Sequence, residues 1–411
     1  MARSSSSLNG KKIGVIGFNA RPIAKSLKLA GAETYVSDYW GDLDLKSVSD
    51  ACIAVLTPVP DIRQRKQLNV PLHQALLDNY LELTKETNID HVIIGSGFDD
   101  HSDILEPLEK CELLLGCNIR QMKNARDRAG LRRMIEDLDV KMPRETMISS
   151  AEEIESKAVQ FPCIVRKKDS GGGSGIRLVH NKNQLRQKML KNPPNEEIYR
   201  PIIQQYISGK DISCSVLGTG KESAVLSIQG QLIGMPTAGR NCDFAYCGNY
   251  LPIAIESKYK RMISEISKKI CNRLHLRGSI GIDYLLDTQG DLWLMEINPR
   301  FQGTLEILEI AGDISVTSLH FEAIQGELPS SKFKFRPATK MIVYSRKDGV
   351  ISDISNFSNV VDISPPGIVV KRGDPICTIL EAAETISQCY CRASNIALEI
   401  QRDVSVNYDV L

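Results

Sequence analysis

Four polar residues in the second half of the chain could together hold a metal-bound nucleotide. Asp283 lies on one expected strand, and thirteen positions later the run Leu-Met-Glu-Ile-Asn-Pro-Arg supplies Glu296, Asn298 and Arg300. Carboxylate and amide oxygens are hard ligands that suit Mg²⁺ carrying a nucleoside triphosphate. A guanidinium suits a phosphoryl group in transfer. These acids could instead line the solvated face of a sheet, but apolar residues flank Glu296 on both sides, which favours metal–nucleotide binding.

A glycine-rich connection joins two expected strands, 163–167 and 176–180. It consists of Ser170, Gly171, Gly172, Gly173, Ser174 and Gly175. Glycines let main-chain amides approach phosphate oxygens without interference from a Cβ atom. The connection lacks the Gly-Lys-Ser/Thr ending of a P-loop, and it leads into a strand, so no helix N-terminus is available for phosphate. A flexible hairpin turn is the alternative. The preceding basic residues favour phosphate binding; they are Arg166, Lys167 and Lys168.

The segment between these two features could receive a nucleoside. Gln204 and Gln205 end an expected strand, and a turn at 208–209 leads to Asp211. The main chain of an extended strand can bond adenine edges, and a nearby carboxylate can accept ribose hydroxyls. An ordinary hairpin explains this segment equally well.

The elements that position these residues begin with alternating strands and helices. Strands are expected at 12–17, 34–37, 51–56, 91–94 and 112–115, with helices at 22–30 and 72–85 between them. This alternation predicts a doubly wound parallel sheet. Gly17 and Ala20 match part of a dinucleotide fingerprint, and Asp38 lies where a ribose-binding acid would. Val15 breaks the fingerprint, so we favour a structural Rossmann-like domain that binds no nucleotide.

The remaining elements do not continue this alternation of strands and helices. A basic helix is expected at 127–138, short elements surround the glycine connection, and antiparallel strands are expected at 211–217 and 224–228. An amphipathic helix at 258–275 precedes the strands 279–286 and 292–297, which carry the metal-type residues. A linker at 326–337 leads to short strands and a final helix around 382–401.

Composition excludes several classes of function. The 411 residues carry a formal net charge of +1, with 42% hydrophobic and 25% charged residues, as in a soluble globular protein. This charge balance argues against binding to nucleic acid. No apolar run is long enough for a membrane span, and the start of the chain lacks the apolar core of a secretory signal. We expect a cytoplasmic protein whose eleven cysteines are mostly buried free thiols.

Taken in order, these pieces resemble the ATP-grasp superfamily. The signature Asp283…Glu-x-Asn-x-Arg300, following a glycine connection, carries the resemblance from about residue 12 to residue 330. Further runs are similar to a group described as predicted ATP-dependent carboligases related to biotin carboxylase. These runs are Gly17-Phe-Asn-Ala-Arg-Pro22, Asp38-Tyr-Trp-Gly-Asp-Leu-Asp44, Tyr246-Cys-Gly-Asn249 and Pro365-Pro-Gly-Ile368 with Gly373-Asp-Pro-Ile-Cys377.

The resemblance implies an α/β fold of ATP-grasp architecture. It comprises an N-terminal Rossmann-like (pre-ATP-grasp) domain, two α+β ATP-grasp subdomains and a small β-rich C-terminal segment. We expect a disordered tail at 1–10, the Rossmann-like domain at 11–120 and the small subdomain with its glycine lid at 121–205. The large subdomain with the Mg²⁺ site is expected at 206–330, and a C-terminal α+β extension at 331–411.

The resemblance also implies roles for single residues. Asp283, Glu296 and Asn298 would hold two Mg²⁺ ions, for which Mn²⁺ could substitute, and Arg300 would stabilise the transferring phosphoryl group. Gln204, Gln205 and the Ile207 main chain would hold the adenine of ATP, and Asp211 the ribose. The loop 171–175 would close over the phosphates. Members of the family usually have phosphate-binding lysines where this chain has Arg128 and Arg166 or Lys167, so the identity of the phosphate contacts departs from the family pattern.

The implied activity is ATP-dependent ligation of a small-molecule carboxylate to an amine or similar nucleophile, through an acyl phosphate, with release of ADP and phosphate. Substrate residues are expected between the Rossmann-like domain and the metal strands. The candidates are Arg21, Asp38, Arg240, Asn241 and Asn249; solvated loop positions are the alternative for each. No nucleic acid or membrane partner is expected, and a homodimer is left open. Two alternatives remain: a kinase acting on a small hydroxylated molecule, and a non-catalytic protein that binds a nucleotide or NAD(P).

Overall fold

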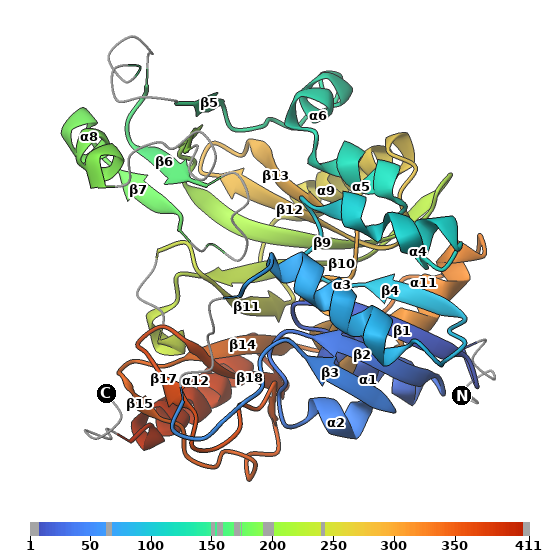
Figure 1. The fold of residues 1–411 in the computed structure, drawn as a ribbon. Helices are drawn as coiled ribbons and strands as arrows, with labels where there is room; N and C mark the ends of the chain where they lie inside the picture. The colour runs from blue at the N-terminus through green and yellow to red at the C-terminus, as the bar shows by residue number, and fades with distance from the viewer. Residues whose placement is uncertain are drawn as a thin grey trace.

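The first sheet of the protein is parallel and begins the chain. The structure, a computed structural model, describes residues 8–62, 68–148, 153, 159–167, 173, 175–191, 201–239 and 243–405. The strand order is β3-β2-β1-β4, from β1 (Lys12–Gly17), β2 (Glu33–Asp38), β3 (Ala51–Ala54) and β4 (His91–Ile94). Helices α1 (Arg21–Leu29), α2 (Leu45–Val48) and α3 (Leu72–Leu83) connect these strands (Figure 1).

This arrangement confirms the predicted α/β fold with a doubly wound N-terminal sheet. The strand expected at 112–115 is reduced to a single bridge between Leu114 and Val92. Because β1 lies between β2 and β4, the chain reverses its direction of winding there, and the loops after β1 and β4 border that switch point.

The largest sheet has eight strands in the order β13-β12-β9-β10-β11-β14-β18-β16, and every neighbouring pair is antiparallel. Its strands are β9 (Gly209–Thr219), β10 (Ser223–Ile233), β11 (Tyr246–Leu251), β12 (Arg277–Asp287), β13 (Leu292–Asn298), β14 (Ala338–Tyr344), β16 (Val360–Val361) and β18 (Pro375–Ala382). The C-terminal strands therefore continue the central sheet through the β11–β14 pair.

Helices cover this sheet at several places. They are α9 (Ser257–Arg273), α10 (Leu305–Gly312), α11 (Val316–Ile324) and α12 (Ile386–Asp403). Helix α9 packs on β9 and β10, α11 on β9 and β12, and α12 on β14 and β18. A 3₁₀ turn, η2 (Pro236–Ala238), lies beside α12, and a small ribbon pairs β15 (Gly349–Val350) with β17 (Val369–Val370).

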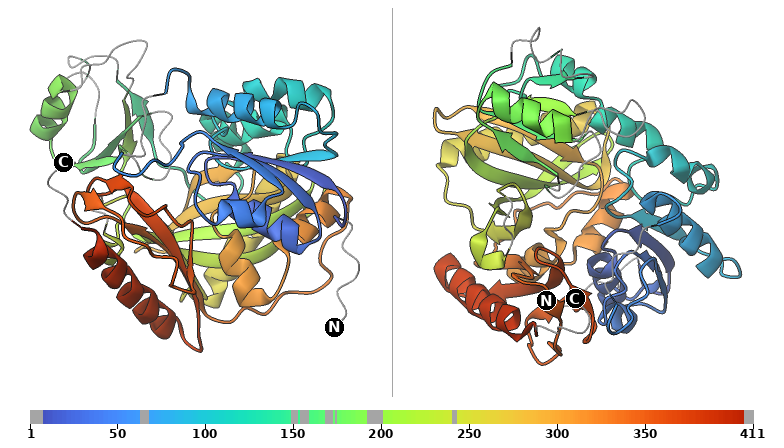
Figure 2. Two further views of the ribbon diagram at one scale, coloured as in Figure 1. Left: turned by 60° about the horizontal axis from the view of Figure 1, so that its bottom comes forward. Right: turned by 60° about the vertical axis from the view of Figure 1, so that its left-hand side comes forward.

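A third sheet forms a separate lobe, at the upper left of Figure 1 and again visible in Figure 2. Its order is β5-β8-β6-β7, from β5 (Glu145–Met147), β6 (Cys163–Arg166), β7 (Arg177–Val179) and β8 (Ile202–Gln205), with helix α8 (Lys182–Lys191). The lobe has its own small hydrophobic core, which includes Val165, Leu185 and Ile203. One of the short elements expected around the glycine connection, a helix at 151–160, lies mostly outside the described part of the chain.

The basic helix expected at 127–138 is present as a shorter helix at 128–134, and a second helix that was not expected precedes it. After η1 (Ser102–Leu105) and α4 (Glu106–Lys110) come α5 (Ile119–Arg126) and α6 (Arg128–Met134). Helix α5 begins with a capping box between Asn118 and Gln121. Asp127 has an extended backbone and ends α5, and its carboxylate accepts a hydrogen bond from the Ala129 amide at 3.1 Å to cap α6. The break separates the arginines that end α5 and begin α6.

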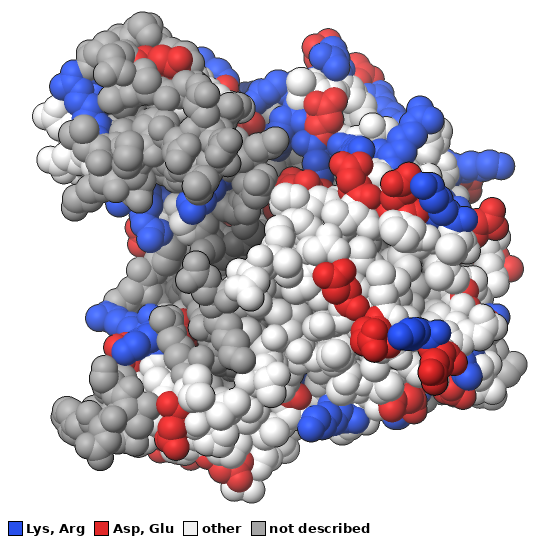
Figure 3. Space-filling model, viewed as in Figure 1, with Lys and Arg blue, Asp and Glu red and all other residues white. Residues whose placement is uncertain are grey.

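One hydrophobic core joins the first sheet to the central sheet. It contains Ile16 and Leu76 from the first sheet and its helix, and Ile282 and Ile297 from β12 and β13. On the face shown in Figure 3, acidic and basic side chains gather along the upper edge over α4 and α5, while the surface over α3 carries few charges. Among the described helices, none has the length and apolar character that crossing a membrane requires.

His320 links three segments at one buried point. Its Nδ1 accepts a hydrogen bond from the Ser279 amide at 2.8 Å, so its Nε2 donates to the Leu115 carbonyl at 3.1 Å. The ring is 2% exposed. Burial, with a further contribution from the charge of Arg277, lowers the pKa of His320 to about 4.

We expect this histidine to make stability depend on pH. The unfolded chain has an ordinary histidine pKa of about 6.5, so it takes up the proton first as the pH falls. The contribution of His320 to the free energy of unfolding should therefore be constant above pH 7 and fall by about 3 kcal/mol between pH 6.5 and pH 4. Urea unfolding at several pH values would measure this, and His320→Gln should show a shallower slope. Equal slopes for both proteins would contradict the neutral, buried imidazole.

Candidate functional site

The register between β12 and β13 brings the predicted metal residues together. Asp283 pairs directly with Glu296, and Gly281 pairs with Asn298, so the three polar side chains lie on one face of the sheet. Asp283 accepts hydrogen bonds from the Ser213 hydroxyl at 2.7 Å and from the Asn298 amide at 3.1 Å. The register shifts next to this pair. Met295, the residue before Glu296 on β13, forms a bulge and has no cross-strand partner.

The two facing carboxylates are electrostatically unfavourable without a cation. Burial, and then the charge of Glu296, raise the pKa of Asp283 to about 7. No group of three or more His, Cys, Asp or Glu side chains in the described residues could hold a metal ion, so the donor set is two carboxylates and one amide. Mg²⁺ takes few protein ligands when it also binds phosphates, and these residues fit that habit.

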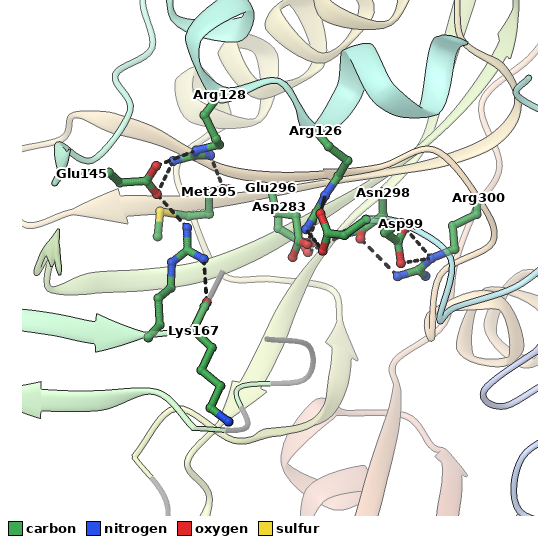
Figure 4. Close-up of polar contacts among 12 residues, drawn as sticks. Asp99, Arg126, Arg128, Glu145, Lys167, Asp283, Met295, Glu296, Asn298 and Arg300 are labelled. Atoms are coloured by element: carbon green, nitrogen blue, oxygen red, sulfur yellow. Dashed lines mark hydrogen bonds and ion pairs between the residues drawn. The ribbon is translucent and has the colours of Figure 1, made fainter. Parts of the chain in front are cut away.

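Arg300 follows the same strand and is held from three sides. Its Nε donates to both oxygens of Asp99, at 2.8 and 2.9 Å. Its Nη2 donates to the Asn298 side-chain oxygen at 3.2 Å, and its Nη1 to the Phe301 carbonyl at 3.0 Å. Figure 4 shows the guanidinium between Asp99 and Asn298.

A second arginine, which the sequence did not single out, reaches the metal residues from α5. Arg126 donates from Nε and Nη2 to the two oxygens of Asp100, at 2.9 and 3.0 Å. Its Nη1 donates to Glu296. Asp99 and Asp100 were not predicted either; both lie in the loop after β4, 201 residues before Arg300 and 26 residues before Arg126 respectively.

Arg128 and Arg166 converge on one carboxylate, that of Glu145 on β5. Arg128 Nε and Arg166 Nη2 donate to its two oxygens at 3.2 and 2.9 Å. Burial alone would raise the pKa of Glu145, but the charges of the two arginines outweigh burial and lower this pKa. Arg128 also donates to the Met295 carbonyl at 2.8 Å, so it joins the small lobe to the bulge on β13. The Lys167 side chain points away from Glu145 (Figure 4).

The residues expected to hold the nucleoside lie on β8, on β9 and in the connection between these strands. Gln204 is buried and accepts from Arg166 Nε at 2.8 Å, and Gln205 accepts from the Arg144 amide at 3.3 Å. Ile207 lies between β8 and β9. Asp211 lies on β9 two residues before Ser213, on the same face as Asp283, and burial raises its pKa to about 6.

The glycine connection is only partly described. Gly171, Gly172 and Ser174 lie outside the described residues, as does Arg240. Gly173 and Gly175 have positive φ angles of 75° and 78°. A Cβ atom on Gly173 would collide with the Phe244 carbonyl, so a side chain cannot be accommodated there.

Two of the predicted substrate residues lie in a buried charge network that joins the first sheet to the C-terminal strands. Arg21, 1% exposed, donates to Asp362 at 2.6 Å and to Glu306 at 2.7 Å, and it lies 3.2 Å from Asp44. Asp38 accepts main-chain hydrogen bonds from the loops after β1 and β2, and burial raises its pKa to about 6.

Asn249 lies closer to the metal residues. It is buried on β11 and accepts a hydrogen bond from the Tyr246 hydroxyl. Burial, and then the charge of Asp283, raise the pKa of Tyr246. Asn249 thus contacts Tyr246, whose pKa is affected by the charge of Asp283, while Arg21 and Asp38 lie in the separate network.

The chain is similar to several known proteins. The model of the ATP-grasp domain family matches residues 125–304. An uncharacterized protein of Methanocaldococcus jannaschii is 23% identical over 89% of this chain and 87% of its own length. The arginine-specific large chain of carbamoyl phosphate synthase from Bacillus subtilis is 23% identical over 77% of this chain, which spans only 30% of that larger protein.

Solved structures share the fold over nearly the whole chain. The biotin carboxylase domain of 2-oxoglutarate carboxylase from Hydrogenobacter thermophilus, a dimer in complex with MgADP, ADP and bicarbonate, superposes with a TM-score of 0.72 at 14% identity, covering 95% of this chain and 89% of that one. The L-amino acid ligase of Bacillus licheniformis gives 0.71 at 15%, covering 97% and 99%. At such identities the likeness establishes the fold, and the reaction must be argued from the site.

We expect Arg21→Met to destabilise the protein strongly. The variant would leave Asp362 and Glu306 buried without their main counter-charge, which should lower the free energy of unfolding by about 3–5 kcal/mol in urea titrations. Lys28→Met is the matched control, because Lys28 forms an exposed pair with Asp50, and it should change stability by less than about 1 kcal/mol. Similar small effects for both variants would contradict the structural role of Arg21.

Proposed function

Because residues 125–304 match the ATP-grasp domain family, we propose that the protein is an ATP-dependent ligase that joins a small-molecule carboxylate to an amine or a similar nucleophile. The observation that carries the proposal is the direct pairing of Asp283 with Glu296, with Asn298 and Arg300 beside them. An acidic pair next to a partly buried guanidinium suits a metal-bound triphosphate whose terminal group is transferred.

In this proposal each part of the site has one task. Asp283, Glu296 and Asn298 hold Mg²⁺, as two ions for which Mn²⁺ can substitute. Bound there, the metal would neutralise phosphate charge and act as a Lewis acid on the group in transfer. Arg300 stabilises the transferring phosphoryl group, while Arg128 and Arg166 bind the remaining phosphates in place of Glu145. Gln204, Gln205 and the Ile207 main chain hold adenine, and Asp211 holds ribose.

The proposed reaction needs no protein nucleophile. A carboxylate oxygen of the acid attacks the γ-phosphorus of ATP, and the bond to the β-phosphate oxygen breaks, giving an acyl phosphate and ADP. The amine then attacks the acyl carbon, phosphate leaves, and the amine nitrogen loses a proton. Catalysis therefore rests on positioning and charge neutralisation by the residues above.

The acid and the amine are not identified by the site, and small molecules remain the proposed class. Support comes from the ligases and carboxylases that share the fold, which include an L-amino acid ligase and a bicarbonate-bound carboxylase domain. A homodimer, and Asn249 and Arg240 as substrate contacts, stay predictions.

Glu296→Gln should lower ATP turnover by about 100-fold or more, because the variant keeps the size of the side chain but removes one of two facing charges. Turnover would be measured as ADP release with pools of small carboxylates and amines. Glu256→Gln, which alters an exposed residue paired with Lys258, is the control and should keep wild-type turnover. Unchanged turnover in Glu296→Gln would refute the site.

Hydroxylamine should trap the acyl phosphate. With MgATP, a carboxylate pool and hydroxylamine, a ligase of this class forms an acyl hydroxamate together with ADP and phosphate, because hydroxylamine replaces the amine as nucleophile. Colorimetric iron(III) assay or mass spectrometry would detect the product. ADP formation with a phosphorylated product and no hydroxamate would instead identify a kinase.

A further inference from the structure

Two neighbouring carboxylates in the loop after β4 each hold an arginine of the candidate site. Asp99 contacts Arg300, which follows β13, and Asp100 contacts Arg126, which ends α5. The two arginines come from different elements, and both are brought to the site by one short segment of the N-terminal sheet. Neither carboxylate belongs to the superfamily signature, which consists of Asp283 and the run from Glu296 to Arg300.

The loop that carries these carboxylates is held on both sides. Phe98, fully buried, inserts into the core shared by the first and central sheets. Gly97 before it has a φ of 110°, a conformation that L side chains rarely adopt. After the pair, the ring of His101 stacks on that of His73, with centroids 3.9 Å apart. The loop is thus anchored well enough to orient what it binds.

The hydrogen bonds of Arg300 leave it partly available. A guanidinium has five N–H groups, and in the described structure three of them are engaged, by Asp99, Asn298 and the Phe301 carbonyl. One N–H on each of Nη1 and Nη2 has no partner among the described residues. Asp99 binds the Nε side, so it orients the group without occupying these two donors.

Arg126 is oriented in a similar way. Asp100 accepts from its Nε and Nη2, and the remaining terminal nitrogen, Nη1, reaches Glu296. The side chains of Asp100 and Asp99 are 26% and 14% exposed, so both pairs are shielded more than surface ion pairs are. Partial burial and two-point contact make such pairs geometrically specific.

We propose that Asp99 and Asp100 are positioning residues of the phosphoryl-transfer site: they orient Arg300 and Arg126 toward the terminal phosphate of bound ATP and thereby couple the N-terminal sheet to the reaction. This rests on the proposed function. The alternative is that Asp99 competes with the anionic ligand for Arg300, in which case removing its charge would strengthen ligand binding.

Calorimetric titration with two probes, MgADP and magnesium adenylyl imidodiphosphate, separates these cases. The wild-type protein should bind the triphosphate analogue more tightly than MgADP. Asp99→Asn keeps the shape of the side chain but loses its charge; it should reduce that preference about tenfold and lower kcat for MgATP turnover, with the MgADP affinity within twofold of wild type. A variant that was merely less stable would weaken both probes alike.

A double-mutant cycle shows whether Asp99 acts through Arg300. Arg300→Lys alone should lose most of the triphosphate preference, and adding Asp99→Asn should reduce it little further. Asp100→Asn with Arg126→Lys should behave in the same non-additive way. Asp103→Asn is the matched control, because Asp103 follows closely in the same segment and pairs with Lys123 at the surface; it should change nothing.

The outcomes distinguish this proposal from the proposed function. If the wild-type protein binds neither probe, or shows no triphosphate preference, the proposed function fails. If the wild-type preference is present and Arg300→Lys removes it, but Asp99→Asn retains or increases it, then only the positioning role is refuted.

Discussion

The site depends on one constraint, the register of β12 against β13. This register sets the carboxylate of Asp283 opposite that of Glu296, and Asn298 beside them, on one face of the central sheet. Burial and the neighbouring charge of Glu296 both raise the pKa of Asp283, so the ionised form of Asp283 is disfavoured here. Positive charge must therefore lie close to this pair of carboxylates.

In the structure, arginines of the protein supply this charge. Arg126 contacts Glu296, Arg300 contacts Asn298, and Arg128 and Arg166 share Glu145. Each arginine comes from a different element: the end of α5, the segment after β13, the start of α6 and the end of β6. A bound metal–triphosphate would bring a cation for the carboxylates and phosphate anions for the arginines. The carboxylates and arginines of the site could then exchange each other for these partners while the overall charge of the site remains balanced. Each of the three sheets carries or positions some of these groups.

The sequence predicted those features that depend on local pattern. Asp283, Glu296 and Asn298 stand on two strands that follow each other in the chain, and alternation along a strand places them on one face. The sequence did not predict four further residues of the site, because no local pattern indicates their contacts; they are Asp99, Asp100, Arg126 and Glu145. The Asp99–Arg300 pair spans 201 residues and the Arg126–Glu296 pair 170. The helix expected at 127–138 begins close to the predicted residue because Asp127 caps it, but the preceding helix α5, which Asp127 ends, was not predicted. Arg21 and Asp38 resembled substrate ligands from their place after β1 and β2, but partners from the C-terminal strands, such as Asp362, were not foreseeable from either segment.

A crystal structure with magnesium and a non-hydrolysable ATP analogue tests the central claim most directly. We expect oxygens of Asp283 and Glu296 at about 2.1 Å from magnesium, with Arg126 displaced from Glu296 and the free N–H groups of Arg300 directed at the γ-phosphate. A triphosphate bound elsewhere, with Arg126 still on Glu296 and no metal between the two strands, would contradict the account.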